Sequence, residues 1–145
     1  MQAESVAPIA HVIQLSVAPV FLLTGIAGLL NVLTGRLSRI VERARQLERS
    51  LLDEAADEGA PAHGQLRTLA SRARWVNASI SLCVTSAILV ASVVMTLFAS
   101  AFWGADYSGI VAGLFIAAML ALIIGLVFFM REIYVATSNL RIGVH

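Results

Sequence analysis

Hydrophobic residues in this chain gather into three long blocks rather than alternating with polar ones. The blocks run over residues 9–33, 76–99 and 110–130, and none of them contains Asp, Glu, Lys or Arg. Each block reaches or exceeds the roughly 20 residues that a helix needs to cross a hydrocarbon layer about 30 Å thick. The pattern therefore predicts an all-α integral membrane protein with three transmembrane helices.

The polar stretch between the first two blocks, residues 36–74, predicts a helical hairpin. One face of its first arm is apolar and carries Leu37, Ile40, Val41, Ala44, Leu47 and Leu51. No Gly or Pro occurs from residue 36 to residue 58, so the first span should continue into this arm as one helix. The segment 59–64, GAPAHG, is expected to break that helix. A second arm should start near Gln65 and merge into the second span.

Composition and charge predict how the chain is oriented. The chain has 145 residues, of which 59% are hydrophobic and 13% are charged, and all ten basic residues are arginines in 36–74 or after Met130. Flanks rich in Lys and Arg stay on the cytoplasmic side during insertion, whereas Glu4 and Asp106 lie in segments without a base. We expect a single membrane domain, 1–145, in a bacterial inner membrane. Its hairpin and its tail, 131–145, should be cytoplasmic and its N-terminus periplasmic.

Aromatic residues lie where such a topology places the two membrane surfaces. Trp103 and Tyr107 fall at the expected outer boundary, and Trp75 and Tyr134 fall at the inner one. Amphipathic rings of this kind prefer the level of the lipid headgroups. The predicted ends of the spans are therefore consistent with one another.

Two segments of the sequence resemble a known family. They are residues 14–25, QLSVAPVFLLTG, and residues 31–45, NVLTGRLSRIVERAR. Together they resemble the opening of a group of bacterial inner-membrane proteins catalogued as a domain of unknown function. The resemblance extends over essentially the whole chain and implies three spans with a cytoplasmic hairpin. It implies no activity, substrate or catalytic residue.

Polar and small residues of the first span fall on one broad helical side that includes Gln14, Thr24 and Asn31. One interpretation is the lining of a pore, where amide and hydroxyl groups replace part of an ion's hydration shell. The other is hydrogen bonding between helices, each contact contributing about 0.6–2 kcal/mol. Pro19 removes one hydrogen bond of the same helix and should bend it, either as a gate or to improve packing.

Two further sets of residues are candidates for contacts rather than for chemistry. Small residues recur at every fourth position of the third span and predict a helix-packing face, within one copy or between copies, at Gly109, Gly113, Ala117, Ala121 and Gly125. Arg36, Arg39 and Arg43 recur just below the membrane. They either anchor the topology or hold a lipid phosphate or another anion through bidentate hydrogen bonds.

No catalytic or metal-binding motif accompanies these residues. The sequence contains no Gly-rich phosphate loop, no Cys-x-x-Cys pair and no His-Glu-x-x-His helix, so we expect no enzyme, no cofactor and no bound metal. The arginines alternate with acids next to lipid, which argues against nucleic-acid binding. Two hypotheses remain. The first is a homo-oligomeric ion channel, and the second is a scaffold or accessory subunit whose cytoplasmic helical hairpin docks a cytoplasmic or membrane protein. The expected partners are the lipid bilayer and further copies of the chain.

Overall fold

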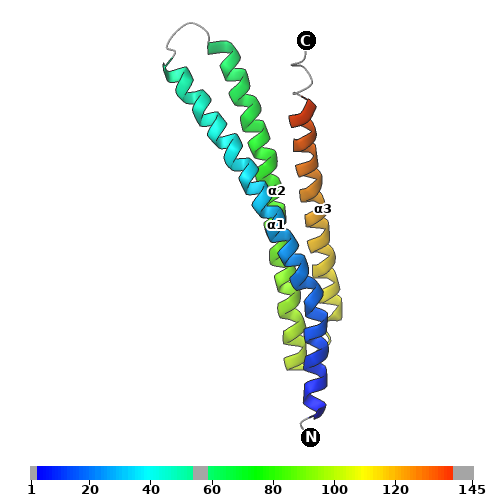
Figure 1. The fold of residues 1–145 in the computed structure, drawn as a ribbon. Coiled ribbons are helices and arrows are strands. Elements are labelled where there is room, and N and C mark those ends of the chain that lie inside the picture. The colour runs from blue at the N-terminus through cyan, green and yellow to red at the C-terminus, as the bar shows by residue number, and fades with distance from the viewer. Residues whose placement is uncertain (1–2, 54–58, 139–145) are drawn as a thin grey trace. The chain divides into compact units, whose positions relative to one another are not determined.

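The computed structural model of the chain is all-α over the residues it describes, 3–53 and 59–138 (Figure 1). Its helices are α1 (Ala3–Asp53), α2 (Gly59–Trp103) and α3 (Ser108–Ser138). Each helix contains an apolar stretch long enough to cross a membrane. The all-α class and three helices long and apolar enough to span a membrane are therefore confirmed, and they fit a membrane protein. The cytoplasmic side of the hairpin stays a prediction.

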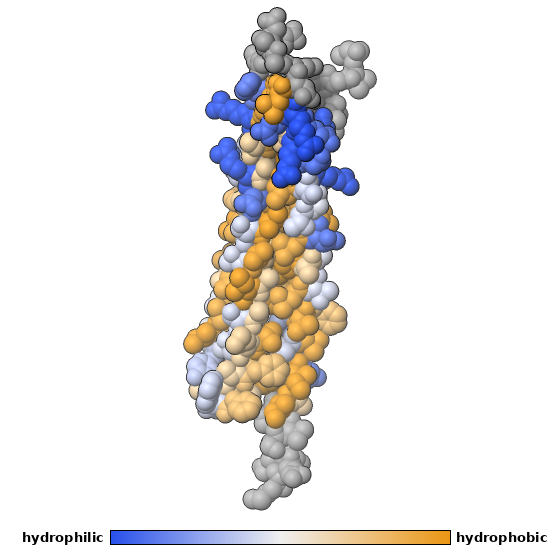
Figure 2. Space-filling model, turned by 90° about the vertical axis from the view of Figure 1, so that its left-hand side faces the viewer, coloured by the Kyte–Doolittle hydropathy of each residue, from blue (hydrophilic) through white to orange (hydrophobic). Residues whose placement is uncertain are grey.

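Segments of all three helices combine into two separately packed units. The first unit comprises Met1–Leu30 and Leu82–Ile123, and the second comprises Asn31–Ser81 and Ile124–His145. Hydrophobic side chains dominate the visible surface of the first unit in Figure 2, whereas hydrophilic ones gather on the second. This distribution follows from the sequence, because all the arginines belong to the second unit.

Small side chains form much of the core of the first unit. On α2 the buried positions alternate steps of three and four residues, at Cys83, Ser86, Val90 and Val93. Steps of three and four residues in alternation are typical of helices that pack side by side. The Ser86 hydroxyl donates a hydrogen bond of 2.8 Å to the backbone carbonyl of Ala118, which is itself fully buried on α3. Small residues on both helices permit this close approach.

The core of the second unit combines apolar side chains with one buried acid. Leu33 and Ile40 of α1 are buried, as are Val76 and Ser79 of α2 and Glu132 of α3. The first-arm positions expected on the apolar face are buried or half-buried, except Val41, which is 39% exposed. The amphipathic pattern therefore identified most of the covered face of this arm.

The boundaries of the hairpin differ from those expected. α1 is helical to Asp53, and the rest of its predicted arm, 54–58, lies outside the described residues. α2 begins at Gly59 rather than near Gln65, so the expected break over 59–64 is wrong. Pro61 stands in the first turn of α2, where backbone N–H groups have no partner within the helix, so its missing N–H removes no bond.

A four-residue turn joins α2 to α3. Gly104 has a φ of 62°, a left-handed conformation that favours glycine, and its N–H donates to the Ser100 carbonyl at 3.0 Å. The Asp106 carboxylate accepts a hydrogen bond of 3.0 Å from the backbone N–H of Ser108, the first residue of α3. Hydrogen bonding from Ser108 lowers the pKa of this carboxyl below its ordinary value of 3.8. The turn therefore satisfies backbone groups at the ends of both helices.

Candidate functional site

A buried carboxylate held by two arginines lies in the second unit. The Glu132 side chain on α3 is 1% exposed. Its Oε2 accepts from Arg36 Nη1 of α1 at 3.2 Å, and its Oε1 accepts from Arg72 Nη2 of α2 at 2.9 Å. Each of the three helices contributes one charge, and we call Arg36, Arg72 and Glu132 the ion cluster.

The helical register of α3 brings Glu132 into this position. Ala118, Gly125 and Glu132 are seven residues apart and all three are buried. A step of seven residues is close to two helical turns, so the three positions face nearly the same direction. Glu132 therefore occupies a core position, and its charge requires partners that the arginines supply.

Aromatic rings contact Arg36 of the ion cluster and the neighbouring Arg131. Arg36 lies over the Phe129 ring at 5.4 Å, and Arg131 lies over the Trp75 ring at 4.7 Å. The Trp75 and Phe128 rings meet edge to face, with centroids 5.4 Å apart and an interplanar angle of 81°. The two cation–π contacts stabilise Arg36 and Arg131 by electrostatic attraction to the rings.

The ion cluster is not fully satisfied in its hydrogen bonds. Arg72 Nε is buried and has no hydrogen-bond partner within the described part of the chain. The same ranges, 3–53 and 59–138, contain no group of three His, Cys, Asp or Glu side chains that could hold a metal ion. The interactions that the cluster shows within the described residues are charge pairs between two guanidinium groups and one carboxylate.

The structure separates the three arginines predicted to contact lipid or an anion. Arg36 is half-buried and turns to Glu132, whereas Arg39 and Arg43 are exposed on α1. Arg36 therefore has an internal partner, which the sequence analysis did not anticipate. Contact of Arg39 and Arg43 with lipid or an anion stays a prediction.

The predicted polar side of α1 is exposed. Gln14, Thr24 and Asn31 are each solvent-accessible in the single chain, and the Thr24 hydroxyl donates to its own helix at the Val20 carbonyl, 3.2 Å away. The side-chain amides of Gln14 and Asn31 form no hydrogen bond with any other described residue. α2 and α3 of the same chain therefore do not supply partners for these two amides.

Pro19 and the small-residue row of α3 differ in burial along their helices. Pro19 is buried in an uninterrupted α1, and the predicted bend there stays a prediction. Gly109, Gly113 and Ala117 are exposed, Ala121 is half-buried and Gly125 is buried. A Cβ added at Gly109 or Gly113 would meet nothing within 4 Å. Among the described residues, Gly109 and Gly113 therefore leave room beside them and Ala117 is exposed, while contact between copies stays a prediction.

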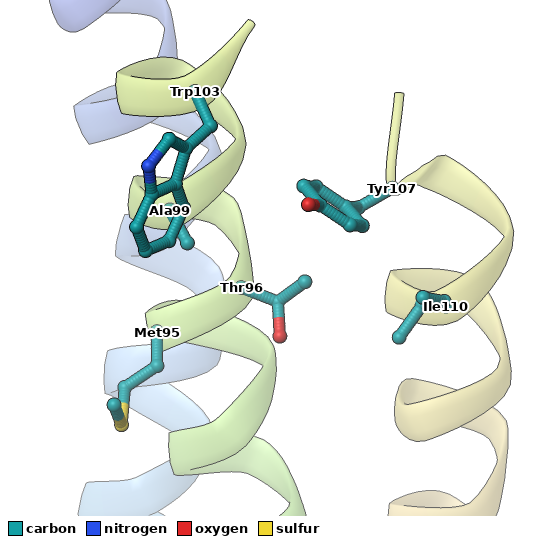
Figure 3. Close-up of a pocket in the computed structure, with 6 residues that line it drawn as sticks. All are labelled: Met95, Thr96, Ala99, Trp103, Tyr107 and Ile110. Atoms are coloured by element: carbon teal, nitrogen blue, oxygen red, sulfur yellow. The ribbon is translucent and has the colours of Figure 1, made fainter. Parts of the chain in front are cut away.

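A largely apolar hollow of about 330 Å³ lies in the first unit beside the turn (Figure 3). Its lining residues come from α2, from the end of the turn and from the start of α3: Met95, Thr96, Ala99, Trp103, Tyr107 and Ile110. The Thr96 hydroxyl donates to the Ser92 carbonyl at 2.8 Å, so its proton is already used. None of the residues that line the hollow is charged.

One protein-family model matches most of the chain. The model of the family described as "protein of unknown function (DUF2721)" matches residues 16–142, which include every member of the ion cluster. The chain belongs to this family. No curated protein and no solved structure matches the chain.

Sequence reasoning missed two of the three members of the ion cluster in this DUF2721 protein. Arg72 and Glu132 lie 60 residues apart in the sequence, and Arg36 and Glu132 lie 96 apart. A weak signal was available, because Glu132 continues the seven-residue spacing of Ala118 and Gly125. The four-residue row of small residues drew attention to a different face of α3.

Proposed function

We propose that this protein is a homo-oligomer in a bacterial inner membrane, and that the polar side of α1 lines an ion-flux pathway between copies. The observation that supports it is the exposure of Gln14, Thr24 and Asn31 in a single chain. Burying an amide in hydrocarbon without a hydrogen-bond partner costs about 2–7 kcal/mol. Water or another copy relieves this cost.

The packing inside each unit favours a pathway between copies over one through a single chain. In the second unit Leu33 and Val76 are fully buried, and in the first unit Cys83 and Val90 are fully buried. These side chains fill the space among the helices of their own unit. In contrast, a Cβ added at Gly25 or Gly28 on α1 would meet nothing within 4 Å, which leaves room for a neighbouring helix or for water.

We infer that the arms and the C-terminus are cytoplasmic and the N-terminus periplasmic, because the arginines lie in residues 36–74 and after Met130. Single cysteines placed at Ser50 and at Ala105 in a Cys83→Ala background test this orientation. A membrane-impermeant thiol reagent applied to intact cells should label position 105 and leave position 50 unlabelled. Labelling of position 50 alone would reverse the orientation.

The deciding experiment combines the mass of the nanodisc-embedded protein with an ion-flux assay in liposomes. We expect an oligomer that conducts, and we expect Asn31→Leu to lower the flux while the mass stays unchanged. The fall should be roughly three- to thirtyfold, the rate equivalent of losing a polar contact worth about 0.6–2 kcal/mol. Val32→Leu is the matched control, because Val32 is an exposed apolar neighbour on the same helix. A monomer without ion flux would refute the channel. Unchanged flux in an intact Asn31→Leu oligomer would show that this side of α1 only makes contacts between helices.

A scaffold or accessory role is the second candidate, and exposed basic side chains favour it. Arg39, Arg43, Arg45 and Arg49 on α1 are all exposed and suit an acidic partner surface. Two results together would support this role instead. The purified particle would show no ion flux, and a copurifying protein would be lost when the charges of Arg43 and Arg49 are reversed. We assign no enzymatic activity, since two arginines already hold the one buried carboxylate of the ion cluster.

A further inference from the structure

We propose that a hollow between α2 and α3 in the second unit binds a phosphate group, supplied by an anionic phospholipid headgroup or by free phosphate. The hollow has a volume of about 180 Å³ and is lined by Thr68, Ser71, Arg72, Trp75, Arg131, Glu132 and Val135. Pockets for drug-sized ligands measure about 300–1,000 Å³, so this one suits a headgroup fragment rather than a whole lipid.

Arg131 is the principal donor of the hollow. Its guanidinium lies over the Trp75 ring at 4.7 Å and contacts no carboxylate of the described residues. The cation–π contact stabilises the guanidinium beside the hollow, while the N–H groups of Arg131 stay available. A planar fork of N–H donors matches two oxygens of a phosphate and binds them bidentately.

The charge around the hollow favours an anion. Glu132 is the one acid that lines it, and both of its oxygens already accept from arginines, Oε2 from Arg36 and Oε1 from Arg72. The lining therefore carries Arg72 and Arg131 against one carboxylate, a net charge of +1, and Arg36 adds a further positive charge through its contact with Glu132. The Ser71 hydroxyl also lines the hollow and forms no hydrogen bond with another described residue, so it adds a neutral donor.

The position of these residues in the sequence favours a lipid as the source. Arg131 directly follows the apolar block 110–130, and Trp75 directly precedes the block 76–99. Both therefore stand where an apolar span gives way to charged sequence, the level of the headgroups. Basic pockets between membrane helices at this level are suited to anionic headgroups.

The test compares the full chain in nanodiscs of neutral phosphatidylcholine with the chain in nanodiscs containing phosphatidylglycerol. Native mass spectrometry measures the retained phosphatidylglycerol, and the thermal midpoint measures stabilisation by the lipid or by added inorganic phosphate. Arg131→Gln should weaken phosphatidylglycerol binding about tenfold, the effect of one charge-assisted contact of about 1.4 kcal/mol. Arg67→Gln is the matched control, because it removes one exposed charge from α2 outside the hollow.

A second variant, Ser71→Asp, introduces a negative charge into the hollow and should also lower binding. If the wild type and Arg67→Gln retain phosphatidylglycerol while Arg131→Gln loses it, the lipid is the source of the phosphate group. Stabilisation by inorganic phosphate with the same dependence on Arg131, and no retained lipid, would establish the free anion. Equal losses in Arg131→Gln and Arg67→Gln, or no loss in either, would overturn the proposal.

Discussion

At the scale of single residues, the decisive interaction is the pairing of Glu132 with two arginines from two other helical segments. A buried carboxylate without partners would be strongly destabilising, because it loses its hydration. Arg36 and Arg72 replace that hydration, and their own side chains remain 41% and 28% exposed. The ion cluster therefore holds α1, α2 and α3 in one register within the second unit.

Replacement of Glu132 by Gln should destabilise the protein more than any surface change of the same size. The amide keeps the shape of the side chain, but its NH₂ group faces one guanidinium and neither arginine retains a counter-charge. We expect a loss of about 2–3 kcal/mol in the free energy of unfolding, below the roughly 3–5 kcal/mol for fully buried pairs, because both arginines reach water. Titration with SDS in mixed micelles measures this free energy of unfolding. Glu48→Gln, at an exposed position of α1, is the control and should change little.

Two buried serines of α2 allow the energy of one interhelical hydrogen bond to be measured. Ser86 donates to the Ala118 carbonyl of α3, whereas Ser79 donates to the Trp75 carbonyl of its own helix at 3.1 Å. Both side chains are fully buried, so the two Ser→Ala changes remove the same atoms. We expect Ser86→Ala to cost about 0.6–1.7 kcal/mol and Ser79→Ala about 0.5 kcal/mol or less. Equal effects would mean that the bond to α3 contributes nothing.

At the scale of helices, sequence periodicity identified the elements and missed part of their boundaries. The apolar blocks predicted α1, α2 and α3 because a membrane span requires length and hydrophobicity, both of which are local properties. The start of α2 was missed because Gly and Pro in 59–64 normally signal a loop, whereas Pro is compatible with a first helical turn. The rule that Gly and Pro signal a loop failed here because these residues stand at the start of a helix, where Pro removes no hydrogen bond.

The start of α3 should respond to acid. The pKa of Asp106 is lowered in the folded protein by hydrogen bonds from Ser108, so its contribution to stability is present above the ordinary value of 3.8 and is lost as the pH falls through the lowered pKa. We expect the thermal midpoint of the wild type to fall in that range. Asp106→Asn keeps an acceptor without a titrating group, so its midpoint should fall less. Identical pH profiles would contradict this role for the carboxylate.

At the scale of the whole molecule, substitutions at exposed small residues of α3 can test whether copies of the chain contact one another there. Gly109, Gly113 and Ala117 are exposed in one chain, and such residues let another helix approach closely. Gly113→Leu should shift the nanodisc-embedded particle to a lower mass if this row lies between copies. Ala112→Leu, at an exposed neighbour off the row, should leave the mass unchanged. An unchanged mass for Gly113→Leu would remove the row from the interface.

Local sequence alone determined three apolar helices, a membrane location, the concentration of arginines in two stretches and most of the covered face of the first arm. These properties depend on composition and on the 3.6-residue period, which each segment carries by itself. Tertiary structure alone decided that Glu132 is buried between Arg36 and Arg72, that Ser86 bonds to α3 and that Arg131 lies over Trp75. Such contacts depend on which faces of distant helices meet, and that choice follows from packing the whole set of side chains together.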